Sequence, residues 1–231
     1  MLEELKDVVY RANMRLRDEG LVVLTWGNAS ARDAKSGLVV IKPSGVAYSK
    51  MKASDMVVVD LSGRVVEGDF RPSSDTPTHL ELYRRFDGIG GIVHTHSAEA
   101  TAWAQACREI GCYGTTHADC FHGKVPLTRV LTEEEVSVDY EGATGVAIAE
   151  TVDPSAPLAR PGALVAGHGP FTWGADVMKA VDNAVSLEAV AKMARLTEMI
   201  HGARMAELLT DYVLDKHYRR KHGPNAYYGQ K

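Results

Sequence analysis

The chain has 231 residues, of which 45% are hydrophobic, 24% charged and 7% aromatic, a composition typical of a globular protein with a full-sized core. The formal net charge is −4 and acidic and basic residues are interspersed, which argues against a broad cationic face for nucleic acid. Because no apolar run is long enough to span a membrane and the N-terminus lacks the apolar core of a signal peptide, we expect a cytoplasmic protein with neither membrane nor nucleic acid as a partner.

The N-terminal part of the chain predicts one helix followed by short strands. Apolar residues recur at helical spacing from Leu2 and stop at Gly20, a residue that commonly ends helices. Short β-branched runs then predict strands that begin at Leu38, Val57, Arg64 and Gly91. Between the last two strands, Thr76 and Pro77 predict the N-cap and first position of a helix that runs to about Phe86.

The C-terminal part predicts further strands and then long helices. Ser97 is expected to cap a helix, and residues 153–162 are expected to form a surface loop. We expect strands near residues 146–151 and 163–166, and helices over residues 176–201 and 204–221. The basic run at the end of the last helix, which comprises Arg219, Arg220, Lys221 and His222, is expected to complement the helix dipole, with contact to a phosphate as the alternative. Strands joined partly by turns and partly by helices predict one α/β domain with a mixed or antiparallel sheet covered by helices.

Three histidines form a candidate metal site. His94 and His96 end the run GIVHTH, and residues two apart on a strand share one face. His168 follows the apolar run ALVA and lies between two glycines, which permit a close backbone approach. Each feature alone is explained as well by an ordinary strand-end or turn histidine, but the three together predict convergence on a metal.

Asp75, in the run PSSDTPTH, is the candidate carboxylate ligand, although a capping aspartate explains the position equally well. Three nitrogen ligands and one carboxylate leave an exchangeable position, the pattern of a catalytic site. Such nitrogen-rich ligation suits one zinc ion per subunit, with manganese or cobalt as alternatives. The chain contains neither a GxGxxG nor a Walker sequence, so no nucleotide-binding motif competes with the metal site.

Seven segments, in order and with compatible separations, closely resemble the class II aldolase/epimerase family: TWGNAS, IKPSG, PSSDTPTH, GIVHTHS, GTTHAD, GHGPFTWG and HYRRKHGPNAYYGQ. The resemblance extends over nearly the whole chain. It implies a single three-layer α/β/α domain over residues 1–231 with a central, mainly antiparallel sheet, assembled as a homotetramer with sites at subunit interfaces. The implied metal ligands are the set reached above, namely Asp75, His94, His96 and His168.

The resemblance also implies roles for residues that would otherwise be interpreted as ordinary turn chemistry. A phosphate pocket is implied at Gly27, Asn28, Lys42, Ser44, Gly45, Ser73 and Ser74. Asp119 and Tyr228 are implied as the acid/base pair, with the tyrosine entering the site of a neighbouring subunit. Thr115 and His217 are weaker candidates for orienting the substrate or the tyrosine.

The activity implied is that of an isomerase that interconverts L-ribulose 5-phosphate and D-xylulose 5-phosphate, as in arabinose catabolism. The hydrogen on carbon four is weakly acidic, so inversion by simple deprotonation is difficult. Retro-aldol cleavage between carbons three and four is the simpler route. It gives an enediolate and glycolaldehyde phosphate, which rejoin with carbon four inverted. One alternative is a class II aldolase that cleaves a sugar phosphate such as fuculose 1-phosphate; such aldolases carry a glutamate at the position of Asp75. Two further alternatives are an epimerase that acts on a related L-xylulose-type substrate and a non-catalytic protein that a metal ion stabilises.

Overall fold

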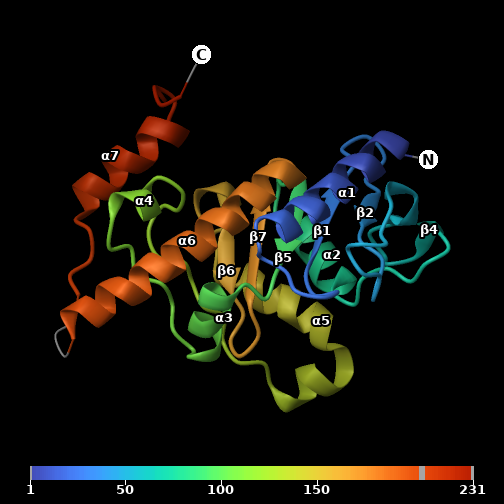
Figure 1. Ribbon diagram of the computed structural model, residues 1–231, viewed down its shortest axis with the longest axis horizontal. Helices are drawn as coiled ribbons and strands as arrows, with labels where there is room; N and C mark the ends of the chain where they lie inside the picture. The colour runs from blue at the N-terminus through green and yellow to red at the C-terminus, as the bar shows by residue number, and fades with distance from the viewer. Residues whose placement is uncertain (1, 203–205, 230–231) are drawn as a thin grey trace.

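The computed structural model describes residues 2–202 and 206–229 (Figure 1). Its strands form one seven-stranded sheet in the order β4-β3-β2-β1-β5-β7-β6. The strands are β1 (Asn28–Arg32), β2 (Val39–Ile41), β3 (Val57–Val59), β4 (Val65–Glu67), β5 (Gly91–His94), β6 (Gly162–Leu164) and β7 (Pro170–Gly174). Every pair of neighbouring strands is antiparallel, so the predicted antiparallel sheet is confirmed.

Helices cover both faces of the sheet. They are α1 (Glu3–Asp18), α2 (Thr76–Arg85), α3 (Ala98–Gln105), α4 (Thr115–Ala118), α5 (Glu133–Ala149), α6 (Val177–His201) and α7 (Asp211–His222). Because side chains alternate along a strand, Val40 packs with α1 and α6 on one face, whereas Val39 and Ile41 pack with α2 and α5 on the other. The three layers implied by the resemblance are therefore present.

The strand predicted near residues 146–151 is wrong, because residues 146–149 end helix α5. The β-branched run VAI suggested a strand, but the helix is begun upstream by a capping box in which Thr132 and Glu135 each bind the backbone of the other. The helix then packs against α2, where the Thr78 hydroxyl donates to the Glu141 carbonyl oxygen at 2.7 Å. The expected surface loop follows, with residues 153–156 exposed.

The caps of two helices differ from those predicted. Ser97 occupies the N-cap position of α3 but makes no capping hydrogen bond. The carboxylate of Glu188, on α6, instead accepts the backbone N–H groups of Glu99 and Ala100 at 2.8 and 2.9 Å. In α2, Asp75 rather than Thr76 is the N-cap residue, and its side chain makes no capping hydrogen bond either.

Helix α7 begins at Asp211 rather than near residue 204; Arg204 itself lies outside the described residues. Residues 206–210, directly before α7, are not helical and are tied to the loop that precedes α4, since the Leu209 N–H donates to the Cys112 carbonyl oxygen at 2.8 Å. Across the described residues, no helix combines the length and the apolarity that a membrane crossing requires.

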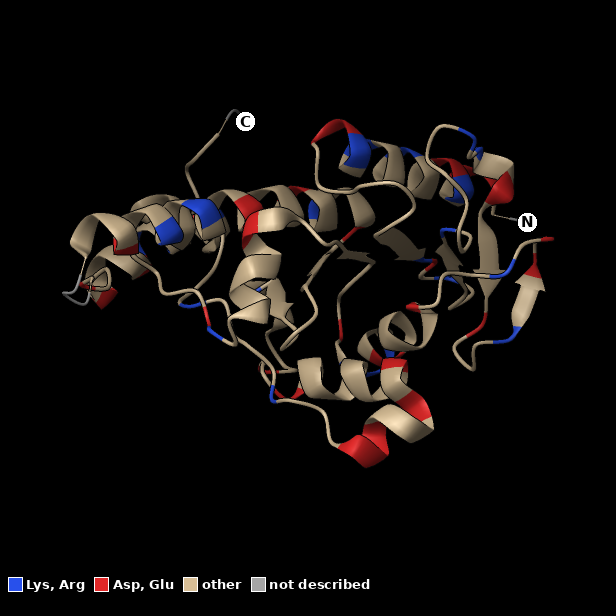
Figure 2. Cartoon of the chain, turned by 60° about the horizontal axis from the view of Figure 1, so that its bottom comes forward, with Lys and Arg blue, Asp and Glu red and all other residues tan. Residues whose placement is uncertain are grey.

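Charged residues of both signs are distributed along the chain (Figure 2). Acidic residues occupy the first turn of α5, and the basic run Arg219, Arg220, Lys221 and His222 occupies the last turn of α7. Each helix end thus carries the sign of charge that its dipole favours, as expected for the basic run.

Candidate metal centre

Three histidine side chains meet where β5 ends. His94 is the last residue of β5, His96 follows two residues later, and His168 lies in the turn between β6 and β7. Because β5 pairs antiparallel with β7, with His94 opposite Phe171, this turn lies beside the end of β5. One ring nitrogen of each histidine lies within 4.8 Å of the other two, so the three could hold a metal ion.

Glycines on both sides of His168 make this turn possible. Gly167 has a φ of 74°, in the left-handed region that glycine adopts readily. A Cβ atom at Gly169 would lie only 2.8 Å from the Thr95 carbonyl oxygen. The turn therefore packs against the residue between His94 and His96, which brings His168 to the other two rings.

The environment of each ring favours the neutral form that binds metals. The Nδ1 atom of His94 lies 3.0 Å from the Pro170 carbonyl oxygen, and its Nε2 lies 3.0 Å from Nε2 of His96. Burial lowers the pKa of His94, His96 and His168, while the charge of Asp75 opposes this shift. Three neutral, convergent nitrogen donors fit a divalent ion such as zinc.

Asp75 lies beside the histidines, although no carboxylate oxygen of a described residue joins their mutually close set of atoms. The Asn28 amide donates to Asp75 Oδ2 at 2.6 Å. Burial alone would raise the pKa of Asp75, but His94, His79 and the Asn28 hydrogen bond together hold it below its usual value. An ionised carboxylate therefore faces the site, and its role as a ligand stays a prediction.

The residues predicted to bind phosphate lie on three neighbouring segments. Asn28 is opposite His94 in the β1–β5 pairing and donates to Ser73 Oγ at 3.0 Å, while the Ser73 N–H donates to the Lys42 carbonyl oxygen at 2.9 Å. A Cβ atom at Gly27 would lie 2.9 Å from the His94 carbonyl oxygen. Ser44, Gly45 and Ser74 lie on the same segments, and Ser44 and Ser74 are exposed.

Two buried polar groups in these segments have unusual surroundings. Burial lowers the pKa of Lys42 to about 8, against the charge of Asp75, and its Nζ donates to the Thr25 carbonyl oxygen at 3.2 Å. The Asn28 Oδ1 atom is buried without a hydrogen-bond partner among the described residues. Such an atom is costly unless it binds a ligand or water, which marks this edge of the site as a polar binding surface.

A second group of predicted residues forms around Asp119. Asp119 follows α4, on which Thr115 lies, and accepts two hydrogen bonds from Arg220 at 2.9 and 2.5 Å and one from His217 at 3.1 Å. The Tyr228 ring packs over Arg220, with 5.1 Å between the guanidinium carbon and the ring centroid. This group lies at the end of the molecule where α4 and α7 meet (Figure 1).

The Asp119 carboxylate is held in its ionised form. Burial would raise the pKa of Asp119, but the hydrogen bonds from Arg220 and His217 and the charge of Lys221 outweigh burial and lower it. Among the described residues, no hydrogen bond or ion pair joins this group to the three histidines. One chain therefore presents the predicted metal ligands and the predicted acid/base pair as two separate groups.

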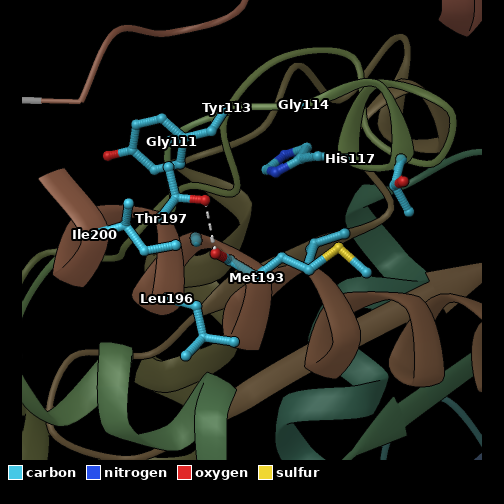
Figure 3. A pocket seen from close by; sticks show the side chains of 11 residues that line it. Gly111, Tyr113, Gly114, His117, Met193, Leu196, Thr197 and Ile200 are labelled. Carbon is cyan, nitrogen blue, oxygen red and sulfur yellow. Dashed lines mark hydrogen bonds between the residues drawn. The ribbon is translucent and has the colours of Figure 1, made fainter.

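A cavity of about 340 Å³ lies between α6 and residues 111–117, which run into α4 (Figure 3). None of the three histidines lines it. Its walls are mainly apolar and include Tyr113, Met193, Leu196 and Ile200. The Thr197 hydroxyl in its wall is already bonded to the Met193 carbonyl oxygen at 2.9 Å. The cavity thus offers no set of metal or phosphate ligands comparable to that at the end of β5.

Several residues at these two groups were not predicted. Phe171 stacks on His94 at 4.2 Å between ring centroids, and the Tyr140 hydroxyl lies 3.4 Å from His168 Nδ1. Phe171 could have been found, because the run GHGPF places it next to a candidate ligand. Tyr140 gave no signal, and Arg220 was assigned to the helix dipole rather than to Asp119, since each is distant in sequence from the residue that it contacts.

Comparison with known proteins shows the family. The sequence profile of the class II aldolase and adducin N-terminal domain matches residues 7–195, and the chain therefore belongs to the class II aldolase family. This is a family of metal-dependent enzymes that bind sugar phosphates, in agreement with the histidine triad. His217 and Tyr228 lie beyond the matched residues.

Solved structures with the same fold include two L-fuculose 1-phosphate aldolases. One is 25% identical, with a TM-score of 0.79 over 94% of this chain and 95% of that chain. The second, from Thermus thermophilus, is 25% identical, with a TM-score of 0.69 over 88% of this chain and 98% of that chain. YgbL from Klebsiella pneumoniae, at 23% identity, shows the fold alone, with a TM-score of 0.72 over 94% and 99% of the two chains.

Proposed function

We propose that the chain is an L-ribulose-5-phosphate 4-epimerase, a cytoplasmic isomerase that interconverts L-ribulose 5-phosphate and D-xylulose 5-phosphate. In this proposal His94, His96, His168 and Asp75 hold one zinc ion, with manganese or cobalt as alternatives. When bound, the ion supplies positive charge that stabilises the negative charge developing on the carbonyl oxygen at carbon two. The proposal is carried by one observation, the Asp75 carboxylate that the Asn28 amide holds at 2.6 Å beside the three convergent histidines.

An aspartate at position 75 supports the epimerase over the aldolase. The family's aldolases carry a glutamate here that transfers protons, whereas Asp75 is one methylene shorter and is held by Asn28 at 2.6 Å. Because its pKa is lowered, Asp75 is a poor proton donor near neutral pH. Proton transfer then belongs to other groups, and Asp119 and Tyr228 are the proposed pair.

Each of these two groups is suited to one half of the proton transfer. Asp119 is ionised and can accept the proton of the hydroxyl on carbon four as the bond between carbons three and four breaks. Tyr228 can donate a proton to the aldehyde oxygen after the aldehyde has turned and the bond re-forms on its other face. The Asn28, Lys42 and Ser73 surface would meanwhile hold the phosphate of the aldehyde fragment, which stays in place while it turns.

Assembly is part of this proposal. Asp119 and Tyr228 lie together in one chain but apart from its histidine triad, so a neighbouring copy would bring them to the metal. A homotetramer with sites at subunit interfaces accounts for this separation.

The proposed activity is tested by incubating the purified protein with L-ribulose 5-phosphate and zinc and measuring D-xylulose 5-phosphate. We expect conversion by the wild type and a loss of at least about tenfold in kcat for Tyr228→Phe, with Tyr212→Phe, which alters an exposed tyrosine of α7, as the control. Full activity of Tyr228→Phe in an intact assembly would contradict the assigned role.

A second candidate function is an aldolase, which the similarity to L-fuculose 1-phosphate aldolases at 25% identity favours. The same incubation separates the two functions, because an aldolase releases the aldehyde. Accumulation of glycolaldehyde phosphate without D-xylulose 5-phosphate, or rapid cleavage of L-fuculose 1-phosphate, would replace the epimerase proposal with this one.

A further inference from the structure

Tyr140 reaches the histidine triad from the middle of helix α5. Its hydroxyl oxygen lies 3.4 Å from Nδ1 of His168, and the two ring centroids are 6.1 Å apart. Tyr140 has no part in the proposed proton transfers, and nothing in the sequence near it suggested a role. Its position is nevertheless set by the backbone of α5, which is interrupted at the residue before it.

An interruption in α5 sets the position of Tyr140. Asp139 has a non-helical backbone, with φ −158° and ψ 78°, and its carboxylate accepts the Gly142 N–H at 3.1 Å. An extended residue whose side chain accepts an N–H three residues later is an N-cap. The second half of α5 therefore starts anew at Tyr140, and the bond from the Thr78 hydroxyl to the Glu141 carbonyl oxygen ties this start to α2.

His94 and His168 share one arrangement around their rings. In His94, Nδ1 faces the Pro170 carbonyl oxygen at 3.0 Å, which leaves Nε2 to face the other histidines. In His168, Nδ1 faces the Tyr140 oxygen. Metal-binding histidines almost always donate their second N–H to an oxygen, which fixes both the tautomer and the ring orientation.

We propose that Tyr140 is a positioning residue that accepts a hydrogen bond from His168 Nδ1–H and so presents the lone pair of Nε2 to the metal. This inference rests on the proposed metal centre. A neutral imidazole that offers a lone pair on Nε2 must carry its proton on Nδ1, and the Tyr140 oxygen is the acceptor within reach. Because 3.4 Å is long for a hydrogen bond, its effect belongs at the low end of the range for such partners.

Metal affinity is the first test. Tyr140→Phe keeps the ring but removes the acceptor, and we expect the zinc dissociation constant, measured by competition with a chromophoric chelator, to rise about tenfold. The control is Tyr212→Phe, which alters an exposed tyrosine on α7. Equal thermal unfolding of the metal-free variants shows that the fold is kept, and a zinc affinity within about twofold of the wild type in Tyr140→Phe would overturn the proposal.

A second variant tests whether the three histidines bind zinc at all. His168→Gln should remove most of the zinc affinity if the triad binds the ion. Unchanged affinity in that variant would refute the metal centre, and the role of Tyr140 with it, whereas a loss in His168→Gln without a loss in Tyr140→Phe refutes only the role of Tyr140.

The tautomer of His168 gives a readout that needs neither metal nor activity. In long-range nitrogen-15 spectra of the metal-free protein, we expect the proton of His168 on Nδ1 in the wild type and a mixture of tautomers in Tyr140→Phe. A wild-type His168 that carries its proton on Nε2 would contradict the proposal.

Discussion

At the residue scale, the candidate metal centre depends on the absence of a side chain at Gly169. A Cβ atom there would lie 2.8 Å from the Thr95 carbonyl oxygen, so the turn that carries His168 would have to move. We expect Gly169→Ala to cost about 1–3 kcal/mol of stability and to weaken zinc binding. Thermal unfolding and chelator competition measure the two effects.

The control for this substitution is Gly114→Ala. A Cβ atom at Gly114 would have no heavy atom of a described residue within 4 Å apart from its own chain neighbours, and its φ of −149° suits any residue. Equal effects of the two substitutions on zinc binding would mean that the turn tolerates a side chain after all.

His117 makes stability depend on pH. Burial lowers its pKa from 6.5 to about 4, although the Gly123 carbonyl oxygen, 2.8 Å from Nε2, opposes the shift. Between these values the unfolded chain binds more protons than the folded chain, so the free energy of unfolding falls as the pH is lowered from 6.5 to about 4. The contribution is at most about 1.4 kcal/mol per pH unit.

Replacing this histidine isolates its contribution. His117→Gln can still donate a hydrogen bond to the Gly123 carbonyl oxygen. We expect this variant to reduce the slope of the free energy of urea unfolding against pH by the equivalent of about one bound proton over this range. His201→Gln, at the exposed end of α6, controls for the loss of a histidine as such. An unchanged slope in His117→Gln would show that His117 does not resist protonation in the fold.

At the element scale, helix α3 depends on a carboxylate from another helix. Glu188 accepts two backbone N–H groups at the N-terminus of α3, whereas the Ser97 side chain caps none. Glu188→Gln replaces one acceptor with an NH₂ group, and we expect a loss of about 1–2 kcal/mol in chemical denaturation. The loss for Ser97→Ala should be smaller; the reverse order would restore Ser97 as the effective cap.

The hydrophobic pattern of the sequence predicts a helix or strand well when the buried residues of that element are the apolar ones. This explains which elements were predicted and which were missed. Helix α1 and strands β2 and β3 were predicted because their apolar residues face the core. Strand β1, with the sequence NASAR, was missed because Asn28 and Ser30 are buried through hydrogen bonds to Ser73 and His79. Helix α5 was missed because its apolar residues do not follow a helical period.

At the scale of the whole molecule, the sequence predicted the histidines of the site better than their surroundings. Local spacing marked His94, His96 and His168, since strand alternation and flanking glycines are visible in the sequence. The ion pair of Asp119 with Arg220 joins residues that are far apart along the chain, and no local pattern encodes such a contact. The division of the predicted site into two groups therefore required the fold.

The whole molecule should stay folded when the metal is removed. Its three apolar clusters are formed by side chains of the sheet and helices that bury one another without an ion, and Phe171 of one cluster stacks on His94. We expect a chelator to leave the circular dichroism of the protein unchanged at about 25 °C, and zinc at roughly a hundredfold excess over its dissociation constant to add about 2.7 kcal/mol of stability. Unfolding in step with metal loss would instead support a purely structural metal.

The exposed segment 153–156 divides the candidate ligands between two stretches of chain. His94 and His96 precede it and His168 follows it, while the β5–β7 pairing brings the two stretches together at the site. If the backbone were cut in this segment, neither fragment would carry all three donors. The bound ion would then act as a cross-link between the two halves, and their reassembly would depend on the zinc concentration.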